Sequence, residues 1–281
     1  MNRTLLCVVA LTTFVACGGS TANEPVATTS ARKSPAPTVM EFCGRTFNLT
    51  AQRVNCQKND ATDLKPLAQL TEVHTIILVV GKLDDLKPLS GLHTLRSLKI
   101  ESPRVQSISA LAGLTALEDL DIKNTSVSDL DPIRGMKELT TLNIYNTTVA
   151  KLGAVAGLPE LREVVFASTR VSDLSPLAKL GDLEVINASN TKITDLTPLS
   201  GLAKLRELNL NRTEVSSLAP LAQLPALGTL HVAATPKLKD LSPLASVKTL
   251  TRLTAEASKF DAKKLDALKK ALPNLKLSAP D

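Results

Sequence analysis

One aliphatic phrase recurs along most of the chain in a fixed register. DLKPLAQL at 63–70 returns as DLKPLSGL at 85–92, DLDPIRGM at 129–136, DLTPLSGL at 195–202 and DLSPLASV at 240–247, with four further copies between them. The copies are 22 residues apart, except for a last interval of 23. Short segments such as SLKIESP and TLNIYNT, in which aliphatic and polar residues alternate, separate the copies. Self-similarity at such a period is typical of repeat proteins that stack one coil on the next.

Each repeat predicts two short elements. The alternating segment has the period of two of a strand that buries one face. The phrase places a proline early among closely spaced aliphatic residues, which fits a single 3-10 turn better than a long helix. Because one coil cannot bury its own leucines, the coils must stack. We therefore expect an α/β solenoid, with a curved parallel sheet, roughly 40 Å long for nine coils, on the concave side and the turns on the convex side.

The consensus LxLxxTxVxxLxPLxxLxxL resembles the leucine-rich repeats of internalin-like bacterial proteins over residues 60–277. The resemblance implies a leucine-rich-repeat solenoid. One position departs from the family, because threonine stands where the family has asparagine. We expect these threonine hydroxyls to hydrogen-bond backbone groups between coils, since buried backbone must find partners. They are Thr125, Thr147, Thr169, Thr191, Thr213 and Thr235.

The flanks of the array, 41–62 and 259–281, differ from the repeats at 63–258 and predict two caps. In the second flank, apolar residues at helical spacing follow Asp261, a favourable N-cap, and stop before Pro273. A last strand at Leu275 and Leu277 is expected after the helix. We expect the helix to cover the final coil. The alternative is a lysine-rich helix that lies on a membrane surface.

The first residues predict export and a lipid anchor. A short basic start and an apolar run fill residues 1–16, which is too short for a comfortable membrane span and typical of a signal peptide. The run ends in FVACGG, which resembles the lipobox of bacterial lipoproteins although Phe14 replaces the usual leucine. That resemblance implies lipidation of Cys17, and Gly18 implies delivery to an outer membrane where the cell has one. An ordinary cleaved signal is the alternative. Residues 17–40, rich in Ser, Thr, Ala and Pro, predict a flexible tether.

Cysteine usage fits an exported domain. Cys7 leaves with the signal peptide in this interpretation and Cys17 carries lipid, so Cys43 and Cys56 form an even pair. In an oxidising compartment we expect a disulfide between them that seals the N-terminal cap. Two buried free thiols are the alternative, and a metal site would need more ligands than this segment offers.

Composition and motifs argue against several function classes. The chain has one Tyr, no Trp and a net charge of +6, with lysines interspersed among acidic residues. Nucleic acid is therefore not an expected partner. The sequence holds no phosphate-binding loop, dinucleotide fingerprint, zinc-protease motif or serine-hydrolase motif. We expect no enzyme activity, no cofactor and no metal.

The outward-facing strand positions form columns along the predicted sheet, and in this architecture they are the binding positions. The middle of these columns is polar and mostly neutral, and it includes the only tyrosine. Tyrosine is favoured at interface hot spots because it combines area with a hydroxyl. Ala167 and Ala233 in the same column indicate room for an incoming group. The candidate partner-binding residues are Asn143, Tyr145, Asn187, Ser189, Asn209, Asn211 and His231. For the tyrosine and the histidine the alternative is an ordinary surface residue.

These observations favour a monomeric, lipid-anchored binding module on the extracytoplasmic side of a bacterial cell envelope. Its partner would be a protein or a glycan held on the concave face. A structural or self-associating envelope component is the second hypothesis, because regular flanks and a mixed-charge surface permit it. An enzyme would need a site built from converging side chains that the repeats do not reveal.

The lipid anchor is tested by Cys17→Ser. Without the thiol that accepts the diacylglyceryl group, the chain is expected to stay unprocessed or to leave the membrane fraction. Cell fractionation and the mass of the mature N-terminus measure both outcomes. Cys7→Ser is the matched control, because that residue lies within the predicted signal peptide. Anchoring and processing of Cys17→Ser identical to those of the native chain would contradict the anchor.

Overall fold

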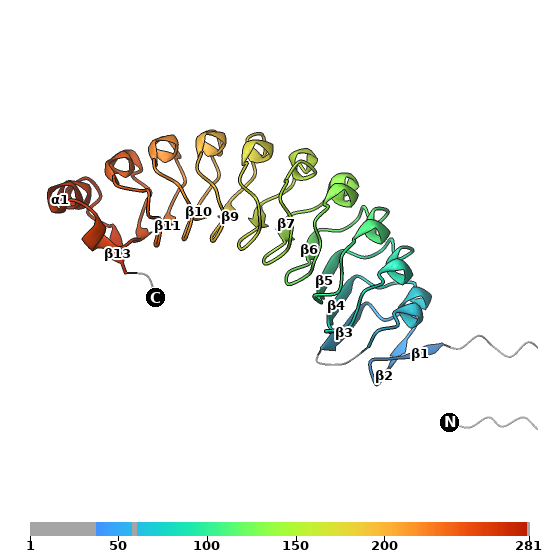
Figure 1. Ribbon diagram of the computed structural model, residues 1–281. Helices are drawn as coiled ribbons and strands as arrows, with labels where there is room; N and C mark the ends of the chain where they lie inside the picture. Colours follow the sequence, from blue (N-terminus) through green and yellow to red (C-terminus); the bar gives the residue numbers. More distant parts are fainter. Residues whose placement is uncertain (1–37, 58–60, 280–281) are drawn as a thin grey trace, which may run out of the picture. The chain divides into compact units, whose positions relative to one another are not determined.

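The computed structural model describes residues 38–57 and 61–279 (Figure 1). The predicted signal peptide, Cys17 and nearly all of the predicted tether lie outside the described residues. Within them, an antiparallel hairpin precedes a parallel sheet of eleven strands. The strands of this sheet follow one another in chain order, as stacked coils require.

The hairpin consists of β1 (Val39–Phe42) and β2 (Arg45–Asn48). The sheet consists of β3 (Arg53–Gln57), β4 (Thr75–Val79), β5 (Ser97–Glu101), β6 (Asp119–Asp121), β7 (Thr141–Asn143), β8 (Glu163–Val165), β9 (Val185–Asn187), β10 (Glu207–Asn209), β11 (Thr229–His231), β12 (Arg252–Thr254) and β13 (Lys276–Ser278). The 3-10 turns span Lys65–Gln69, Lys87–Leu89, Ser109–Leu111, Asp131–Gly135, Val155–Gly157, Ser175–Leu177, Thr197–Leu199, Ala219–Leu221, Ser242–Ser246 and Ala257–Lys259. One α-helix, α1 (Ala262–Ala271), is described.

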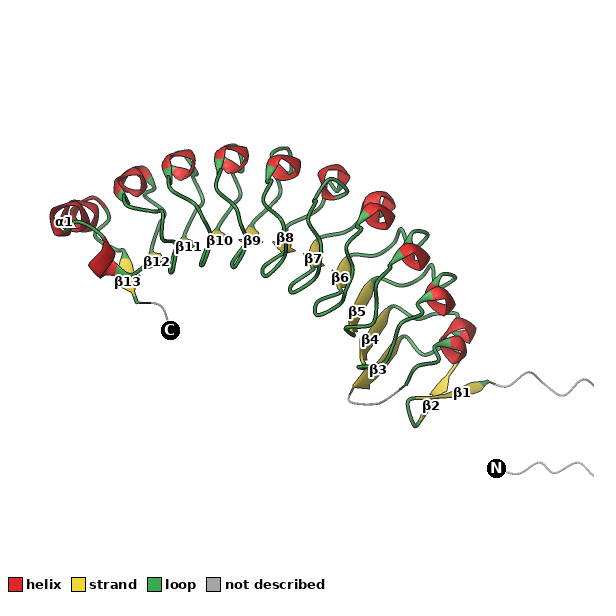
Figure 2. Cartoon of the chain, viewed as in Figure 1, coloured by secondary structure: helices red, strands yellow, loops and turns green. Residues whose placement is uncertain are grey.

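The predicted fold class, a leucine-rich-repeat solenoid, is confirmed. Figure 2 shows the strands along the concave side of the array and the 3-10 turns of the repeats along its convex side. Aliphatic side chains fill the space between the two. In the coil of β6, Leu120, Ile122, Leu130 and Ile133 are each at most 3% exposed. Full burial of such a side chain is worth about 1.5–3 kcal/mol, so stacking supplies the stability that a single coil lacks.

Six of the nine phrases open with an aspartate whose carboxylate accepts the first amide of the 3-10 turn. The carboxylate of Asp195 accepts a hydrogen bond from the amide of Thr197 (2.8 Å). The hydroxyl and the amide of Thr197 hold the pKa of the Asp195 carboxyl below its usual range. The same capping bond recurs at Asp63, Asp85, Asp129, Asp173 and Asp240, and the hydroxyls of Ser107 and Ser217 replace it in two coils. The phrase therefore begins with an acceptor because the turn exposes an amide there.

The threonine ladder is present, but the prediction that it links neighbouring coils is wrong for five of its six members. Thr125 donates to the carbonyl of Ile122 (2.8 Å) and Thr191 to that of Ala188 (2.6 Å), three residues earlier in the same coil. Thr147, Thr169 and Thr213 make the equivalent bond. Thr235 differs, because its hydroxyl reaches Leu210 of the preceding coil at 3.2 Å.

The backbone itself links the coils at this corner. The residue before each threonine has a left-handed backbone, with φ between 52° and 57°, at Asn124, Asn146, Ser168, Asn190, Arg212 and Ala234. This conformation turns the threonine hydroxyl back toward its own strand. It also leaves the amide of the left-handed residue to bond the next coil, as Asn124 bonds the carbonyl of Tyr145 (2.9 Å). Asparagine tolerates the conformation better than most residues, which explains its frequency here.

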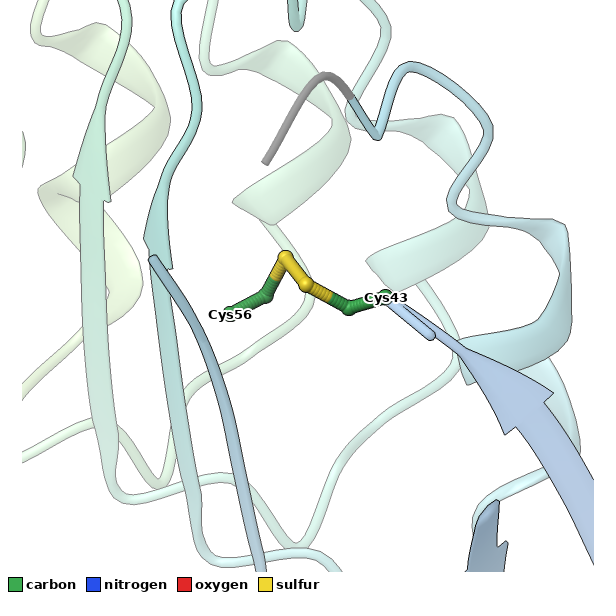
Figure 3. Close-up of a disulfide and its surroundings, with 2 residues drawn as sticks. All are labelled: Cys43 and Cys56. Atoms are coloured by element: carbon green, nitrogen blue, oxygen red, sulfur yellow. A yellow bond between two sulfur atoms is a disulfide. The ribbon is translucent and has the colours of Figure 1, made fainter. Parts of the chain in front are cut away.

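The N-terminal cap joins the sheet directly. Its strand β3 pairs with β4 in parallel register, so the sheet extends into the flank. The expected disulfide between Cys43 and Cys56 is present, with Cα atoms 5.9 Å apart (Figure 3). It ties the end of β1 to β3, and Met40 and Phe42 of β1 are buried beside the first coil. Strand β1 begins at Val39, within the range predicted as tether.

The C-terminal cap has the expected order of helix and strand. Asp261 accepts a hydrogen bond from the amide of Lys264 (3.0 Å) at the start of α1. Leu268 and Leu272 are buried in the common core, and β13 pairs with β12. The apolar face of α1 therefore covers the last coil, as expected for a cap.

The threonine hydroxyl is tested by Thr191→Val. This nearly isosteric change leaves the buried carbonyl of Ala188 without its donor and should cost about 1–3 kcal/mol of unfolding free energy. Thr191→Ser is the control, because it keeps the hydroxyl and removes only a methyl group. Urea denaturation followed by circular dichroism measures both. A valine variant as stable as the serine variant would show that the hydrogen bond contributes nothing.

Candidate functional site

The strand register brings most of the predicted site residues together on the concave side. The central column runs through Asn143 on β7, Asn187 on β9, Asn209 on β10 and His231 on β11. These side chains are half-buried, whereas the leucines and isoleucines beside them in the strands are fully buried. Tyr145, Ser189 and Asn211 lie two residues further along their coils, just beyond the strand ends.

The asparagines of the central column have a structural role that was not predicted from the sequence. The side-chain oxygen of Asn143 accepts the amide of Tyr145 (3.0 Å), and that of Asn209 accepts the amide of Asn211 (3.0 Å). Asn187 does the same for Ser189, and Asp121 for Lys123. Each of these side chains thus closes the turn that follows its strand. Among the described residues, the NH₂ groups of Asn143, Asn187 and Asn209 have no protein partner.

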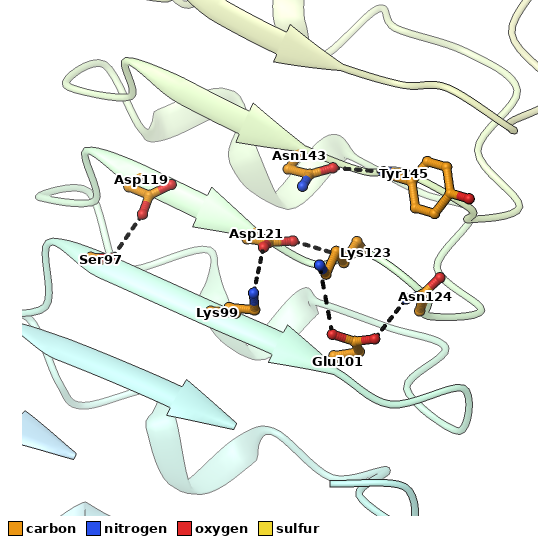
Figure 4. Close-up of polar contacts among 9 residues, drawn as sticks. All are labelled: Ser97, Lys99, Glu101, Asp119, Asp121, Lys123, Asn124, Asn143 and Tyr145. Carbon is orange, nitrogen blue, oxygen red and sulfur yellow. Dashed lines mark hydrogen bonds and ion pairs between the residues drawn. The ribbon is translucent and has the colours of Figure 1, made fainter. Parts of the chain in front are cut away.

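In the N-terminal part of the concave face, charged side chains of neighbouring coils pair with one another. Figure 4 shows Lys99 reaching Asp121 (3.4 Å) and Lys123 reaching Glu101 (3.9 Å) across neighbouring coils. Ser97 donates to Asp119 (2.8 Å) in the same region. These groups satisfy one another, so an incoming partner would have to break existing contacts before making new ones.

Tyr145 lies where this paired region ends. Its side chain is 40% exposed, and it is one of two large hydrophobic residues that are exposed in the described part of the chain, the other being Val39. The space expected beside it at Ala167 is not available, because that residue is 1% exposed and thus covered by its neighbours. The tyrosine therefore stands out from the concave face instead of bordering a hollow there.

A depression of about 630 Å³ opens further along the concave face, between β10 and β13. Asn209, Asn211, His231 and Ala233 line it, although Ala233 is itself only 3% exposed and the depression does not reach Tyr145. Its remaining lining residues were not anticipated, since they lie in the last coils and in the left-handed corner: Arg212, Ala234, Thr254, Glu256, Ser278 and Ala279. Thr254 and Glu256 belong to the outward-facing columns predicted from the sequence but were not among the candidate binding residues, and one further strand would have added Ser278.

Three side chains form a hydrogen-bonded row through this depression. His231 Nδ1 lies 2.9 Å from the hydroxyl oxygen of Thr254, which lies 3.1 Å from that of Ser278. In residues 38–57 and 61–279, no group of three or more His, Cys, Asp or Glu side chains is placed to hold a metal ion. In the same residues, no helix is long and apolar enough to cross a membrane.

Solved structures that are similar in fold include leucine-rich-repeat proteins of bacteria. An internalin C2 from Listeria monocytogenes is 26% identical over 67% of this chain and 83% of its own, with a TM-score of 0.61. An internalin F from the same species is 20% identical over 85% of this chain and 86% of its own, with a TM-score of 0.62. A leucine-rich-repeat protein from Leptospira interrogans is 19% identical over 81% of this chain and 72% of its own, with a TM-score of 0.59.

The fold is that of an internalin-like leucine-rich-repeat protein. No family model matches the sequence, and the comparison with curated proteins found no match. The fold of these neighbours commonly serves protein binding, but fold alone does not identify a partner. A binding function must therefore be inferred from the side chains of the concave face.

Two substitutions of Asn187 distinguish the role of its side-chain oxygen from that of its NH₂ group. Asn187→Asp keeps the oxygen that accepts the amide of Ser189, as Asp121 does naturally, so the unfolding free energy should change little. Asn187→Leu removes the acceptor and should cost about 0.5–1.5 kcal/mol. Thermal and urea denaturation measure the pair. Equal stability of the aspartate and leucine variants would contradict a structural role for the oxygen.

Proposed function

We propose that this protein is a lipid-anchored binding module of a bacterial cell envelope, and that it holds a protein partner on the concave face between β7 and β11. The observation that carries the proposal is the row of unpartnered amide NH₂ groups at Asn143, Asn187 and Asn209, with the exposed Tyr145 beside it. Asn187 and Asn209 lie on neighbouring strands, about 4.8 Å apart, and Asn143 lies two strands from Asn187 because Val165 of β8 stands between them. Backbone carbonyls or hydroxyls of an extended partner can meet donors at these spacings.

Tyr145 supplies the apolar part of such a contact. An exposed tyrosine next to unpaired polar donors is the composition of a protein interface hot spot. A glycan, the other candidate ligand, would also meet the amide groups but would find a single aromatic ring to stack on. The tyrosine and the donor row together therefore favour a protein.

The sides of the solenoid, between its concave and convex faces, offer fewer unpaired charges to a partner, because several charged side chains there pair between coils. Lys204 bonds Asp182 and holds the pKa of that carboxyl below its usual range, and Lys237 does the same for Glu214 at 2.7 Å. Arg96 and Glu118 form another such pair. This internal pairing supports a monomer with binding on the concave face over self-association through these sides.

The location follows from the N-terminal sequence. The lipobox-like FVACGG predicts a lipid on Cys17, and the predicted tether would hold the solenoid clear of the membrane. The disulfide between Cys43 and Cys56 supports an oxidising, extracytoplasmic compartment.

The concave face is tested by crosslinking capture from envelope extracts. A triple variant, Tyr145→Ala with Asn187→Asp and Asn209→Asp, removes the aromatic ring and two donors while it keeps the acceptors that the turns need. Captured partner should fall roughly tenfold or more, the loss expected for a hot spot. Lys179→Ala, on the convex side, is the control. Undiminished capture by a folded triple variant would refute the concave site, and concentration-dependent assembly in light scattering would favour the structural alternative.

A further inference from the structure

The depression between β10 and β13 coincides with the most irregular coil of the array. Ala233 and Ala234 stand where the preceding coil has Asn211 and Arg212, so side-chain volume is missing at both positions. This is also the coil of the 23-residue interval. Side chains of the coils on either side rise around the two alanines, and the hollow of about 630 Å³ is the result.

The turn after β11 is also closed differently. In four other coils, an asparagine or aspartate of the central column accepts the amide two residues later, but His231 occupies that position here and contacts Thr254. The amide of Ala233 is accepted instead by the side-chain oxygen of Asn211 from the preceding coil, at 2.7 Å. That bond orients the Asn211 amide with its oxygen toward the backbone and leaves both N–H donors of its NH₂ group without a partner among the described residues.

Donors exceed acceptors among the groups that line this hollow. Asn209 and Asn211 both use their oxygens on backbone amides, which leaves two NH₂ groups. The Arg212 side chain has no hydrogen bond or ion pair with any described residue. The one carboxylate, Glu256, already pairs with Lys259. A guanidinium beside two amide donors fits a carboxylate, since Arg presents paired N–H groups that match its two oxygens.

We infer that this hollow is a binding site for the carboxylate of an acidic side chain, carried by an extended segment of the protein partner, with Arg212, Asn209 and Asn211 as its donors. The inference rests on the proposed function and names the chemistry of its partner. Tyr145 lies four coils away, which is roughly 20 Å at the spacing of neighbouring strands. An extended segment of about six residues spans that distance and contacts both the tyrosine and the hollow.

The site is tested with a short synthetic peptide in which aspartate and serine alternate, and with a matched peptide in which asparagine replaces aspartate. Nuclear magnetic resonance follows the backbone amides of Ala233 and Ala234 during titration of the protein. The aspartate peptide should shift these amides and bind roughly tenfold more tightly than the asparagine peptide, because charge-assisted hydrogen bonds are the stronger ones. Equal affinity of the two peptides, or shifts confined to other coils, would overturn the inference.

Arg212→Gln should weaken the aspartate peptide roughly tenfold and leave the asparagine peptide nearly unchanged. Arg170→Gln is the matched control, because Arg170 is equally exposed and lies outside the hollow. Ala234→Gln fills the hollow without a change of charge and should also weaken binding. Arg212→Gln that binds the aspartate peptide as Arg170→Gln does would overturn the assignment of the guanidinium.

A trisaccharide of galacturonic acid distinguishes the two sources of a carboxylate. If it binds more tightly than the aspartate peptide and depends on Arg212, the ligand is an acidic glycan and the peptide inference is overturned. The two proposals also fail separately, provided that the concave-face variant spares the hollow. Loss of capture in the double variant Tyr145→Ala with Asn187→Asp, together with Arg212-independent peptide binding, leaves the concave face in place and removes only the carboxylate site.

Discussion

Contact between successive coils is the interaction on which the whole structure depends. No coil contains enough residues to surround its own leucines, so each one is stable only between two others. The consequence is seen in the core column next to the strands. Phe166 fills a position where most coils have isoleucine, leucine or valine, and Ala188 stands at the same position in the next coil. A large side chain beside a small one keeps the density of the core constant, as close packing requires.

The same dependence explains the two caps and the backbone corner. At each end a coil would expose an aliphatic face, and the structure covers it with a disulfide-tied hairpin at one end and with α1 at the other. Between the ends, every coil needs a tight corner after its strand. A left-handed residue supplies the corner and a buried threonine hydroxyl caps the carbonyl that the corner leaves free. Arg212 and Ala234 adopt this conformation with more strain than asparagine would, and both border the hollow.

Periodicity was sufficient to predict the fold, because spacing alone determines which side chains must be buried together. The strand register, the 3-10 turns and the terminal helix all follow from it. The directions of individual hydrogen bonds do not follow from spacing. Thr191 was expected to reach a neighbouring coil, but the left-handed φ of Asn190 turns its hydroxyl inward. Likewise, the asparagines of the central column were read as binding groups, yet their oxygens serve the turns and only their NH₂ groups remain for a ligand.

Each of these amides thus has a structural oxygen and an NH₂ group without a partner in the described part of the chain, and this limits which part of the concave face can bind a ligand. A column of asparagines selected only for binding would have both ends of each amide exposed, whereas here one end is committed to the fold. Aspartate would serve the turn equally well, as it does at Asp121, where Lys99 neutralises it. From β7 onward the column has asparagine at three positions, and no lysine column accompanies it. The fold requires only the oxygen at these positions, so the NH₂ group is the part of each amide that is available to a ligand. The same holds at the hollow near β11, where Asn209 and Asn211 each use the side-chain oxygen on a backbone amide, and where Glu256, the carboxylate of the lining, pairs with Lys259.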